Sequence, residues 1–246
     1  MRFLLYNIRY GAGIGKRFHL PFPYSGFLKR TNGNLRQITD FIRLVNPDII
    51  GLLEVDSGSY RSEKTNQAEA IGRELEHFHV YHSKYPSDSL AQRVPLVNKQ
   101  GNAFLTNQEI QSHRFHYCSE GIKRLVMELE LEDFTIFLVH LSLKFRHRQY
   151  QLQDLHTMVK KVTKPVIVAG DFNAFWGDRE LQLFLAAAGL KSANNLGQPS
   201  HPSRAPRRQL DYIFHSPEIH ATDFQIPHVT LSDHSPLVCD FEVITF

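Results

Sequence analysis

The stretch Val166-Ile167-Val168-Ala169-Gly170-Asp171-Phe172-Asn173 decides how the chain is interpreted. Its first four residues are apolar and mostly β-branched, which is typical of a strand buried on both faces. Asp171 and Asn173 follow, on the same side of the chain if the extended backbone continues. Polar groups at the end of a buried strand need partners. A metal ion, a phosphate or a positioned water would satisfy them, and an ordinary Asx turn is an equally good explanation of this stretch alone.

The composition is that of a globular protein. The chain has 246 residues, of which 42% are hydrophobic and 22% charged, enough for a sizeable core. No linker-like break interrupts it, so we expect one domain over residues 1–246. The net charge of +3 fits an anionic substrate but is too small to indicate a nucleic-acid coat.

The cysteines and the N-terminus bear on the compartment. Cys118 and Cys239 lie far apart in the sequence, so they form neither a metal-type pair nor a disulfide framework. The first apolar run reaches the polar Asn7 too soon for a signal peptide. No apolar run approaches the ~18 residues of a membrane span. We therefore expect a cytoplasmic protein without a membrane anchor, and a monomer by default.

Hydrophobic periodicity predicts an alternation of strands and helices. The predicted helices cover residues 35–45, 66–78, 144–159 and 181–188, and the predicted strands cover residues 2–8, 48–55, 101–106, 125–131, 134–141, 166–169, 210–214 and 237–243. The 66–78 helix is expected to bury Phe78. Strand 125–131 is expected to be half-exposed because glutamates alternate with its apolar residues. His113 and His116 are interpreted as a surface cluster.

Six of the predicted strands have a polar residue at or beside one end. These residues are Asn7, Glu54, His140, Asp171 with Asn173, Asp211, and Asp233 with His234. Because stacked strands bring equivalent ends together, we expect the six ends to meet in one cleft. Their oxygen donors suit Mg²⁺ or Mn²⁺. Zinc is less favoured, because no His-Glu-x-x-His spacing occurs, and no Gly-x-Ser-x-Gly motif indicates a serine hydrolase.

These strand ends belong to a set of motifs that runs through nearly the whole chain. The chain resembles the endonuclease/exonuclease/phosphatase superfamily, which includes pancreatic-type DNases, abasic-site endonucleases, inositol-polyphosphate phosphatases and bacterial sphingomyelinases. The matching segments, in the family's order, are Tyr6-Asn7-Ile8, Leu53-Glu54-Val55, Gly101-Asn102-Ala103-Phe104-Leu105, Val139-His140-Leu141-Ser142, Gly170-Asp171-Phe172-Asn173, Leu210-Asp211-Tyr212-Ile213 and Ser232-Asp233-His234.

The resemblance implies an α/β (α+β) fold, a four-layer sandwich of two mixed β-sheets packed face to face with helices outside. It also implies a divalent metal ion, Mg²⁺ or Mn²⁺. Glu54 matches the principal metal ligand, with Asn7 beside it, and Asp233 would bind the metal or orient its neighbour.

The same resemblance implies the catalytic residues. Asp171 matches the residue that activates the attacking water, and Asn173 one that holds the water or a phosphate oxygen. His140 and His234 would contact the scissile phosphate, and Asp211 would orient His234. The expected reaction is metal-assisted attack of water on phosphorus, which a bound cation promotes by neutralising charge and supplying the nucleophile.

The substrate stays open, because one fold hosts many functions. A nuclease is favoured slightly, because Lys16, Arg17, Lys29 and Arg30 alternate with aromatic residues in the 10–33 loop, and basic residues recur at 144–148 and 204–208. Asn102, Arg124, Arg146 and Arg207 are the candidate substrate-binding residues. The alternatives are an enzyme acting on a lipid headgroup or inositol phosphate, and a non-catalytic nucleic-acid-binding relative.

Overall fold

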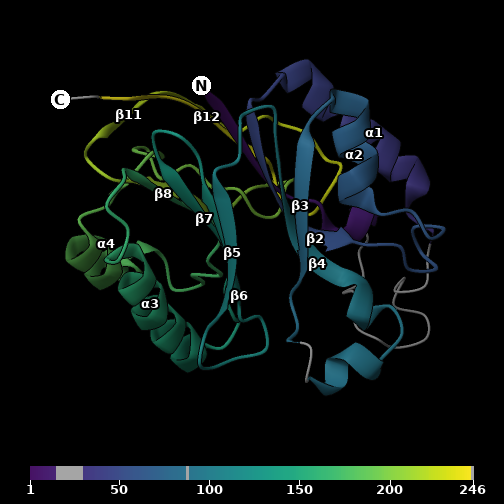
Figure 1. Ribbon diagram of the computed structural model, residues 1–246, viewed down its shortest axis with the longest axis horizontal. Coiled ribbons are helices and arrows are strands. Elements are labelled where there is room, and N and C mark those ends of the chain that lie inside the picture. Colours follow the sequence, from purple (N-terminus) through teal and green to yellow (C-terminus); the bar gives the residue numbers. More distant parts are fainter. Residues whose placement is uncertain (15–29, 87–88, 245–246) are drawn as a thin grey trace.

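The structure, a computed structural model, describes residues 1–14, 30–86 and 89–244. Its strands form two six-stranded sheets, in the orders β11-β12-β1-β2-β4-β3 and β5-β6-β7-β8-β10-β9 (Figure 1). Each sheet is mixed, because β1 pairs with β2, and β7 with β8, in parallel, whereas their other neighbours are antiparallel. The strands are β1 Arg2–Asn7, β2 Ile49–Asp56, β3 Phe78–Ser83, β4 Gln100–Thr106, β5 Ser112–Tyr117, β6 Leu125–Glu130, β7 Thr135–His140, β8 Val166–Asp171, β9 Lys191–Ser192, β10 Asp211–His215, β11 Ile219–Gln225 and β12 Leu237–Val243.

Helices cover the outer face of each sheet, which makes the four layers that the family resemblance implies. Figure 1 shows α1 (Asn32–Val45) and α2 (Gln67–Leu75) beside the first sheet, and α3 (Phe145–Val159) and α4 (Gln182–Ala188) on the opposite side of the molecule. One apolar cluster joins α1 and α2 to the first sheet, and another joins α3 and α4 to the second.

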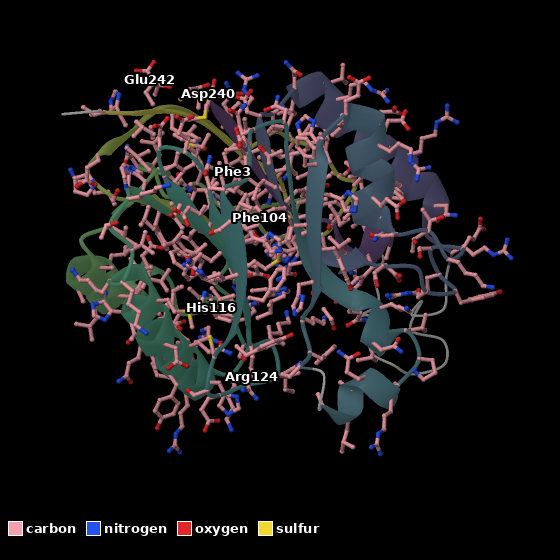
Figure 2. All side chains as sticks on the ribbon, viewed as in Figure 1. Phe3, Phe104, His116, Arg124, Asp240 and Glu242 are labelled. Carbon is pink, nitrogen blue, oxygen red and sulfur yellow. The ribbon has the colours of Figure 1, made fainter. Side chains whose placement is uncertain are left out.

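The largest apolar cluster lies between the two sheets. Phe3 and Phe104 of the first sheet, labelled in Figure 2, pack there with Leu138 of the second. The sheets approach closely at Gly51, where an added Cβ would lie 2.9 Å from Cδ1 of Leu138. The interior is therefore built from alternate side chains of strands from both sheets, as expected for a sheet-on-sheet sandwich.

Two predictions about local structure were wrong. Helix α2 ends at Leu75, and Phe78 instead opens the edge strand β3, where it is 66% exposed. Strand β6 is buried except at Glu130, because Leu125, Met127 and Leu129 face the cluster between the sheets and Val126 packs in the cluster under α3 and α4. Strand β5, which the sequence did not reveal, pairs along its edge. Glu128 is buried there, and its carboxylate contacts His116 Nε2 at 2.6 Å and Arg114 Nη1 at 2.8 Å, so His116, which we expected to be solvated, has a partner in the protein.

The expected basic and aromatic 10–33 loop falls largely on residues 15–29, outside the described residues. Of its basic residues, Arg30 is described, and it forms an exposed ion pair with Glu63. Within the described ranges, no helix combines the length and the apolar character that crossing a membrane requires.

Register places the polar strand ends together. His140 pairs with Asp171 across β7 and β8, and Asp171 pairs with Asp211 across β8 and β10. In the first sheet, Asn7 pairs with Leu53 across β1 and β2, one residue before Glu54. Because β1·β8 and β2·β8 are also in contact, these ends of the two sheets meet at one edge of the sandwich.

Candidate active site

Asp171 lies at the centre of the cluster. Its Oδ2 lies 3.2 Å from His140 Nε2, 3.4 Å from Asn7 Nδ2 and 3.9 Å from His234 Nε2. Burial would raise the pKa of this carboxyl, but the charges of His140 and His234 hold it well below its usual range. Asp171 is therefore a buried, ionised hydrogen-bond acceptor that faces three side chains from different elements.

His234 and Asp211 form a buried pair beside Asp171. Nδ1 of His234 lies 2.7 Å from Oδ2 of Asp211, which also accepts a 2.6 Å hydrogen bond from the Ser200 hydroxyl. Burial opposes the charged imidazole, but Asp211 and Asp171 raise the pKa of His234 to about 10. His234 is therefore an imidazolium at neutral pH, with Nε2 turned toward Asp171, as required for a donor to an anion.

Glu54 comes from the other sheet and is surrounded by positive charge. Lys123 Nζ lies 3.7 Å and His140 Nε2 3.9 Å from Oε1 of Glu54, and Lys123 also contacts His140 Nε2 directly. Burial would raise the pKa of Glu54, but Lys123 and the buried Lys84 lower it to about 2. Burial in turn lowers the pKa of Lys84 to about 7.

Two site residues have left-handed backbone conformations, which residues other than glycine rarely adopt. Glu54 has φ +54° at an irregularity in the β2–β4 pairing, and Asn173 has φ +50°. Each such residue costs about 1–3 kcal/mol and persists where the surroundings enforce it. The Asn173 amide is fixed by a 2.9 Å bond to the carbonyl of Leu141, and its backbone N–H by a 3.0 Å bond to Asp171.

Asp233 and Asn7 are held by Arg9. Nε of Arg9 lies 3.3 Å from Oδ2 of Asp233, and its backbone N–H donates to Oδ1 of Asn7 at 3.1 Å. Among the described residues, no hydrogen bond or ion pair joins Glu54 to Asn7 or to Asp233. The ligand roles of these three residues stay predictions.

The chemistry of the donors fits a hard cation. Oδ1 of Asp211 is buried without a hydrogen-bond partner in the described structure, close to the ionised Asp171. Asp171, Asp211 and His234 bring ligand-type atoms within 4.8 Å of one another, but a protonated His234 has no lone pair to offer. Carboxylate oxygens therefore remain as the donors, which suits Mg²⁺ or Mn²⁺.

The four predicted substrate-binding residues lie in different environments. Asn102 is buried, and its Oδ1 accepts a 3.4 Å bond from the Glu54 backbone, so it belongs to the cluster. Nε of Arg124 donates to the Cys118 carbonyl. Arg146 is exposed beside Tyr150, and Arg207 is exposed in the loop before β10. The structure thus places Asn102 with the acids and gives the three arginines no contact with them.

Several residues of the cluster were missed from the sequence. They are Arg9, Lys84, Lys123, Ser200 and His201, whose ring centroid lies 4.7 Å from that of His234. Of these residues, Arg9 could have been found from the sequence, because it comes two residues after Asn7. The two lysines lie on loops or strand ends whose distance from Glu54 depends on tertiary structure.

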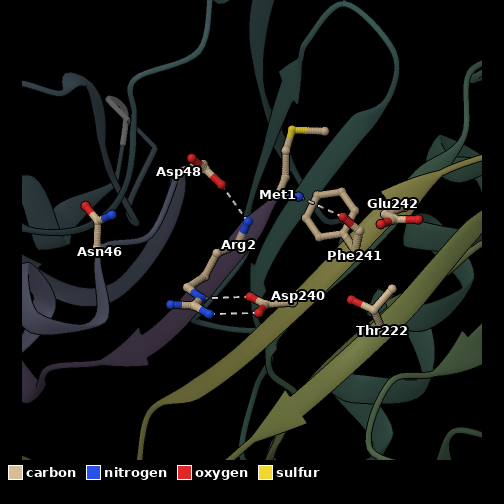
Figure 3. A pocket seen from close by; sticks show the side chains of 8 residues that line it. All are labelled: Met1, Arg2, Asn46, Asp48, Thr222, Asp240, Phe241 and Glu242. Carbon is tan, nitrogen blue, oxygen red and sulfur yellow. Dashed lines mark hydrogen bonds and ion pairs between the residues drawn. The ribbon is translucent and has the colours of Figure 1, made fainter.

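A separate hollow lies at the other end of β1, around Arg2 (Figure 3). Arg2 donates to both oxygens of Asp240 at 2.7 and 2.8 Å, and the N-terminal ammonium donates to the Phe241 carbonyl. Figure 2 shows Asp240 and Arg124 at opposite ends of the molecule. Arg2 and Asp240 there are paired with each other.

The chain is similar to one protein family and to several known proteins. The model of the "Endonuclease/Exonuclease/phosphatase family" matches residues 4–234. A UPF0294 protein of Yersinia pseudotuberculosis is 31% identical over 155 residues, 62% of this chain and 53% of that protein. The chain therefore spans about half the length of this relative. The uncharacterized protein YbhP of Escherichia coli is 26% identical over 85% of this chain and 88% of its own length.

Solved structures share the fold at low sequence identity. The human Nocturnin catalytic domain with bound sulfate superposes with a TM-score of 0.69 at 22% identity, over 99% of this chain and 94% of its own. Danio rerio TDP2 complexed with single-strand DNA product superposes with a TM-score of 0.70 at 15% identity, over 99% of both chains. A mannosyl-6-phosphatase of Bacteroides thetaiotaomicron superposes with a TM-score of 0.71 at 14% identity, over 98% of this chain and 99% of its own.

Proposed function

The chain belongs to the endonuclease/exonuclease/phosphatase family, and from its site we propose that it is a Mg²⁺- or Mn²⁺-dependent phosphodiesterase that cleaves nucleic acid. Members of this family are generally hydrolases acting on phosphoester bonds. The observation that carries the proposal is the convergence of His140 and His234 on the buried Asp171 carboxylate, with Asp211 paired to His234.

Each buried group has a role that follows from its charge. Asp171 accepts a hydrogen bond from the attacking water and orients it toward phosphorus. Imidazolium His234 donates from Nε2 to a phosphate oxygen, where negative charge grows in the transition state. Asp211 keeps His234 protonated and fixes its ring through the 2.7 Å bond to Nδ1. The Asn173 amide is held beside the water, and His140 faces the same phosphate.

Glu54, with Asn7 beside it and Asp233 as a further donor, would hold the divalent cation. When bound, the cation neutralises phosphate charge and acidifies the attacking water. Lys123 and Lys84 contribute further positive charge around Glu54, which suits an anionic phosphodiester and disfavours a neutral ester.

Nucleic acid is the substrate that the surroundings support best. Exposed Arg207 and Arg208 lie in the loop that leads into β10, and Lys144 and Arg146 lie in the segment that follows β7. Basic side chains that contact phosphate groups position a nucleic-acid backbone on a protein. The Danio rerio structure of the same fold was solved with a single-strand DNA product.

A turnover screen tests the function. Purified protein with Mg²⁺ or Mn²⁺, and with a chelator as control, is assayed on bis-p-nitrophenyl phosphate, plasmid DNA, single-stranded DNA, RNA, sphingomyelin and inositol phosphates. We expect chelator-sensitive cleavage of the phosphodiesters, with nucleic acid preferred. Asp171→Asn and His234→Ala should each lose at least about 10²-fold in kcat, whereas the exposed controls Asp40→Asn and His220→Ala should not. Turnover that survives both site substitutions would reject the proposal.

A further inference from the structure

An exposed aromatic surface adjoins the candidate site. Phe145, Phe175 and Trp176 are 49%, 36% and 78% exposed, and we call these three residues the aromatic platform. Phe175 and Trp176 come two and three residues after Asn173, and Phe145 comes five residues after His140. The two segments that deliver site residues at the ends of β7 and β8 therefore also deliver the platform.

The platform rests on a buried ion pair. Arg148 bonds to Glu180 through Nε at 3.0 Å and Nη2 at 2.5 Å, and both side chains are almost fully buried. The Arg148 guanidinium lies 5.8 Å from the Phe145 ring centroid and 6.0 Å from that of Phe175. Glu180 accepts the backbone N–H of Trp176 at 2.8 Å. One buried pair thus contacts the Phe145 and Phe175 rings and the backbone of Trp176.

The structure changes the interpretation of Arg148. In the sequence, Lys144, Arg146 and Arg148 together suggested a basic flank for a groove. The structure buries Arg148, where it also donates to the carbonyls of Ser142 and Leu143 at 3.1 and 2.6 Å. Arg148 therefore supports the surface from below and does not face a ligand.

The charge around the platform is positive. The exposed Arg208 guanidinium lies 5.7 Å from the Phe175 ring centroid, and Lys144 and Arg146 are exposed on either side of Phe145. Of the acids nearby, Glu180 is paired with Arg148, whereas Asp178 accepts from the Tyr212 hydroxyl at 2.8 Å and keeps its charge. Apolar rings beside the exposed Lys144, Arg146 and Arg208 suit a ligand with both a ring face and a phosphate.

We propose that the aromatic platform is a binding subsite for an unpaired base of single-stranded nucleic acid, next to the phosphate that the site cleaves. This deepens the proposed function and rests on it. Aromatic side chains beside basic groups bind single strands by stacking on bases while the cations follow the backbone. A bilayer is the other surface that exposed aromatics meet, but here the exposed Arg208 guanidinium lies against the Phe175 ring, which keeps charge where a membrane contact needs apolar surface.

The chain offers a direct measurement, because Trp176 is its single tryptophan. Intrinsic fluorescence is followed in chelator, so that no turnover occurs, while a short oligothymidylate is added to the full chain. We expect saturable quenching. An equally long phosphodeoxyribose backbone without bases should quench much less. A blue shift with phosphatidylglycerol vesicles and no quenching by oligothymidylate would assign the platform to a membrane and overturn the proposal, as would a response to neither.

Variants with a matched control sharpen the test. Phe175→Ala should weaken oligothymidylate binding about fivefold or more, the loss expected for one stacked base. Trp176→Ala should raise the KM for single-stranded DNA by a similar factor. The control is Phe78→Ala, since Phe78 is 66% exposed on β3, paired with Thr106 at the end of β4 away from Asn102. Equal loss in the control would overturn the proposal.

Failure of this inference is distinguishable from failure of the proposed function. Chelator-sensitive hydrolysis of bis-p-nitrophenyl phosphate without fluorescence quenching would leave the phosphodiesterase and remove the platform. Quenching by oligothymidylate without hydrolysis of any phosphoester would leave a nucleic-acid-binding site and remove the enzyme.

Discussion

His140 and Asp171 occupy the same register position on the parallel strands β7 and β8, and Nε2 of His140 lies 3.2 Å from Oδ2 of Asp171. Asp211 is the partner of Asp171 on the other side, in the antiparallel β10. Three candidate catalytic side chains thus form a row across neighbouring strands. Their mutual distances are set by the backbone hydrogen bonds of the sheet, which is a rigid way to preorganise a site.

The first prediction concerns Gly170, the residue before Asp171. It has φ +154°, and an added Cβ would lie 1.9 Å from the carbonyl oxygen of Val139. Gly170→Ala must push β7 and β8 apart at His140 and Asp171. We expect a loss of about 2 kcal/mol or more in the free energy of unfolding, measured by urea denaturation.

The matched control for this substitution is Gly33→Ala. Gly33 lies in α1, and nothing would come within 4 Å of its Cβ. Alanine in that helix should stabilise the protein by about 0.5–1 kcal/mol. If both alanines had the same effect, the close approach at Gly170 would not be what constrains the strands.

A second prediction concerns the buried pair of Arg148 and Glu180. Arg148→Ala leaves an unpaired buried carboxylate, so we expect a loss of about 3–5 kcal/mol in the free energy of unfolding. The exposed pair Arg73–Glu69 provides the comparison, and Arg73→Ala should cost under about 1 kcal/mol. Chemical denaturation of both variants checks the difference, and similar small losses would contradict the supporting role given to Arg148.

Much of this arrangement was predictable from the sequence, and for a physical reason. Runs such as Val166–Ala169 are buried on both faces, so their composition is distinctive, and a polar residue that follows them stands out. Strand β5 escaped notice because His113 and Arg114, which project from opposite faces of the strand, are both exposed. They look like solvated residues until the pairing of β5 with β6 is known. Lys84 and Lys123 escaped for a related reason: their proximity to Glu54 is created by the packing of the two sheets.

A third prediction concerns the cation. If Glu54 is the principal ligand, Glu54→Gln should weaken Mn²⁺ binding by at least about tenfold, since even changes to residues that support a metal ligand cost that much. Calorimetric titration of the purified protein measures this without reference to activity. Glu69→Gln, on the exposed surface of α2, is the control and should leave the affinity unchanged. Unaltered Mn²⁺ affinity in Glu54→Gln would assign the ion to other residues.

The last prediction concerns the charge of His234 in metal-free protein. Burial lowers its pKa, but Asp211 and Asp171 raise it to about 10. Because the folded pKa lies above the ordinary value near 6.5, the imidazolium stabilises the fold below pH ~6.5, and this contribution is lost as the pH rises through about 10. Asp211→Asn removes the nearest negative charge, so the pKa of His234 should fall toward its ordinary value, and alkaline destabilisation should begin at lower pH.

Titration of the imidazole nitrogens by NMR in chelator measures the shift directly, with Asp40→Asn as the variant that should leave it in place. A His234 that titrates identically with and without Asp211 would mean that the 2.7 Å contact does not hold the proton, and the imidazolium role proposed for the phosphate would then have no physical basis.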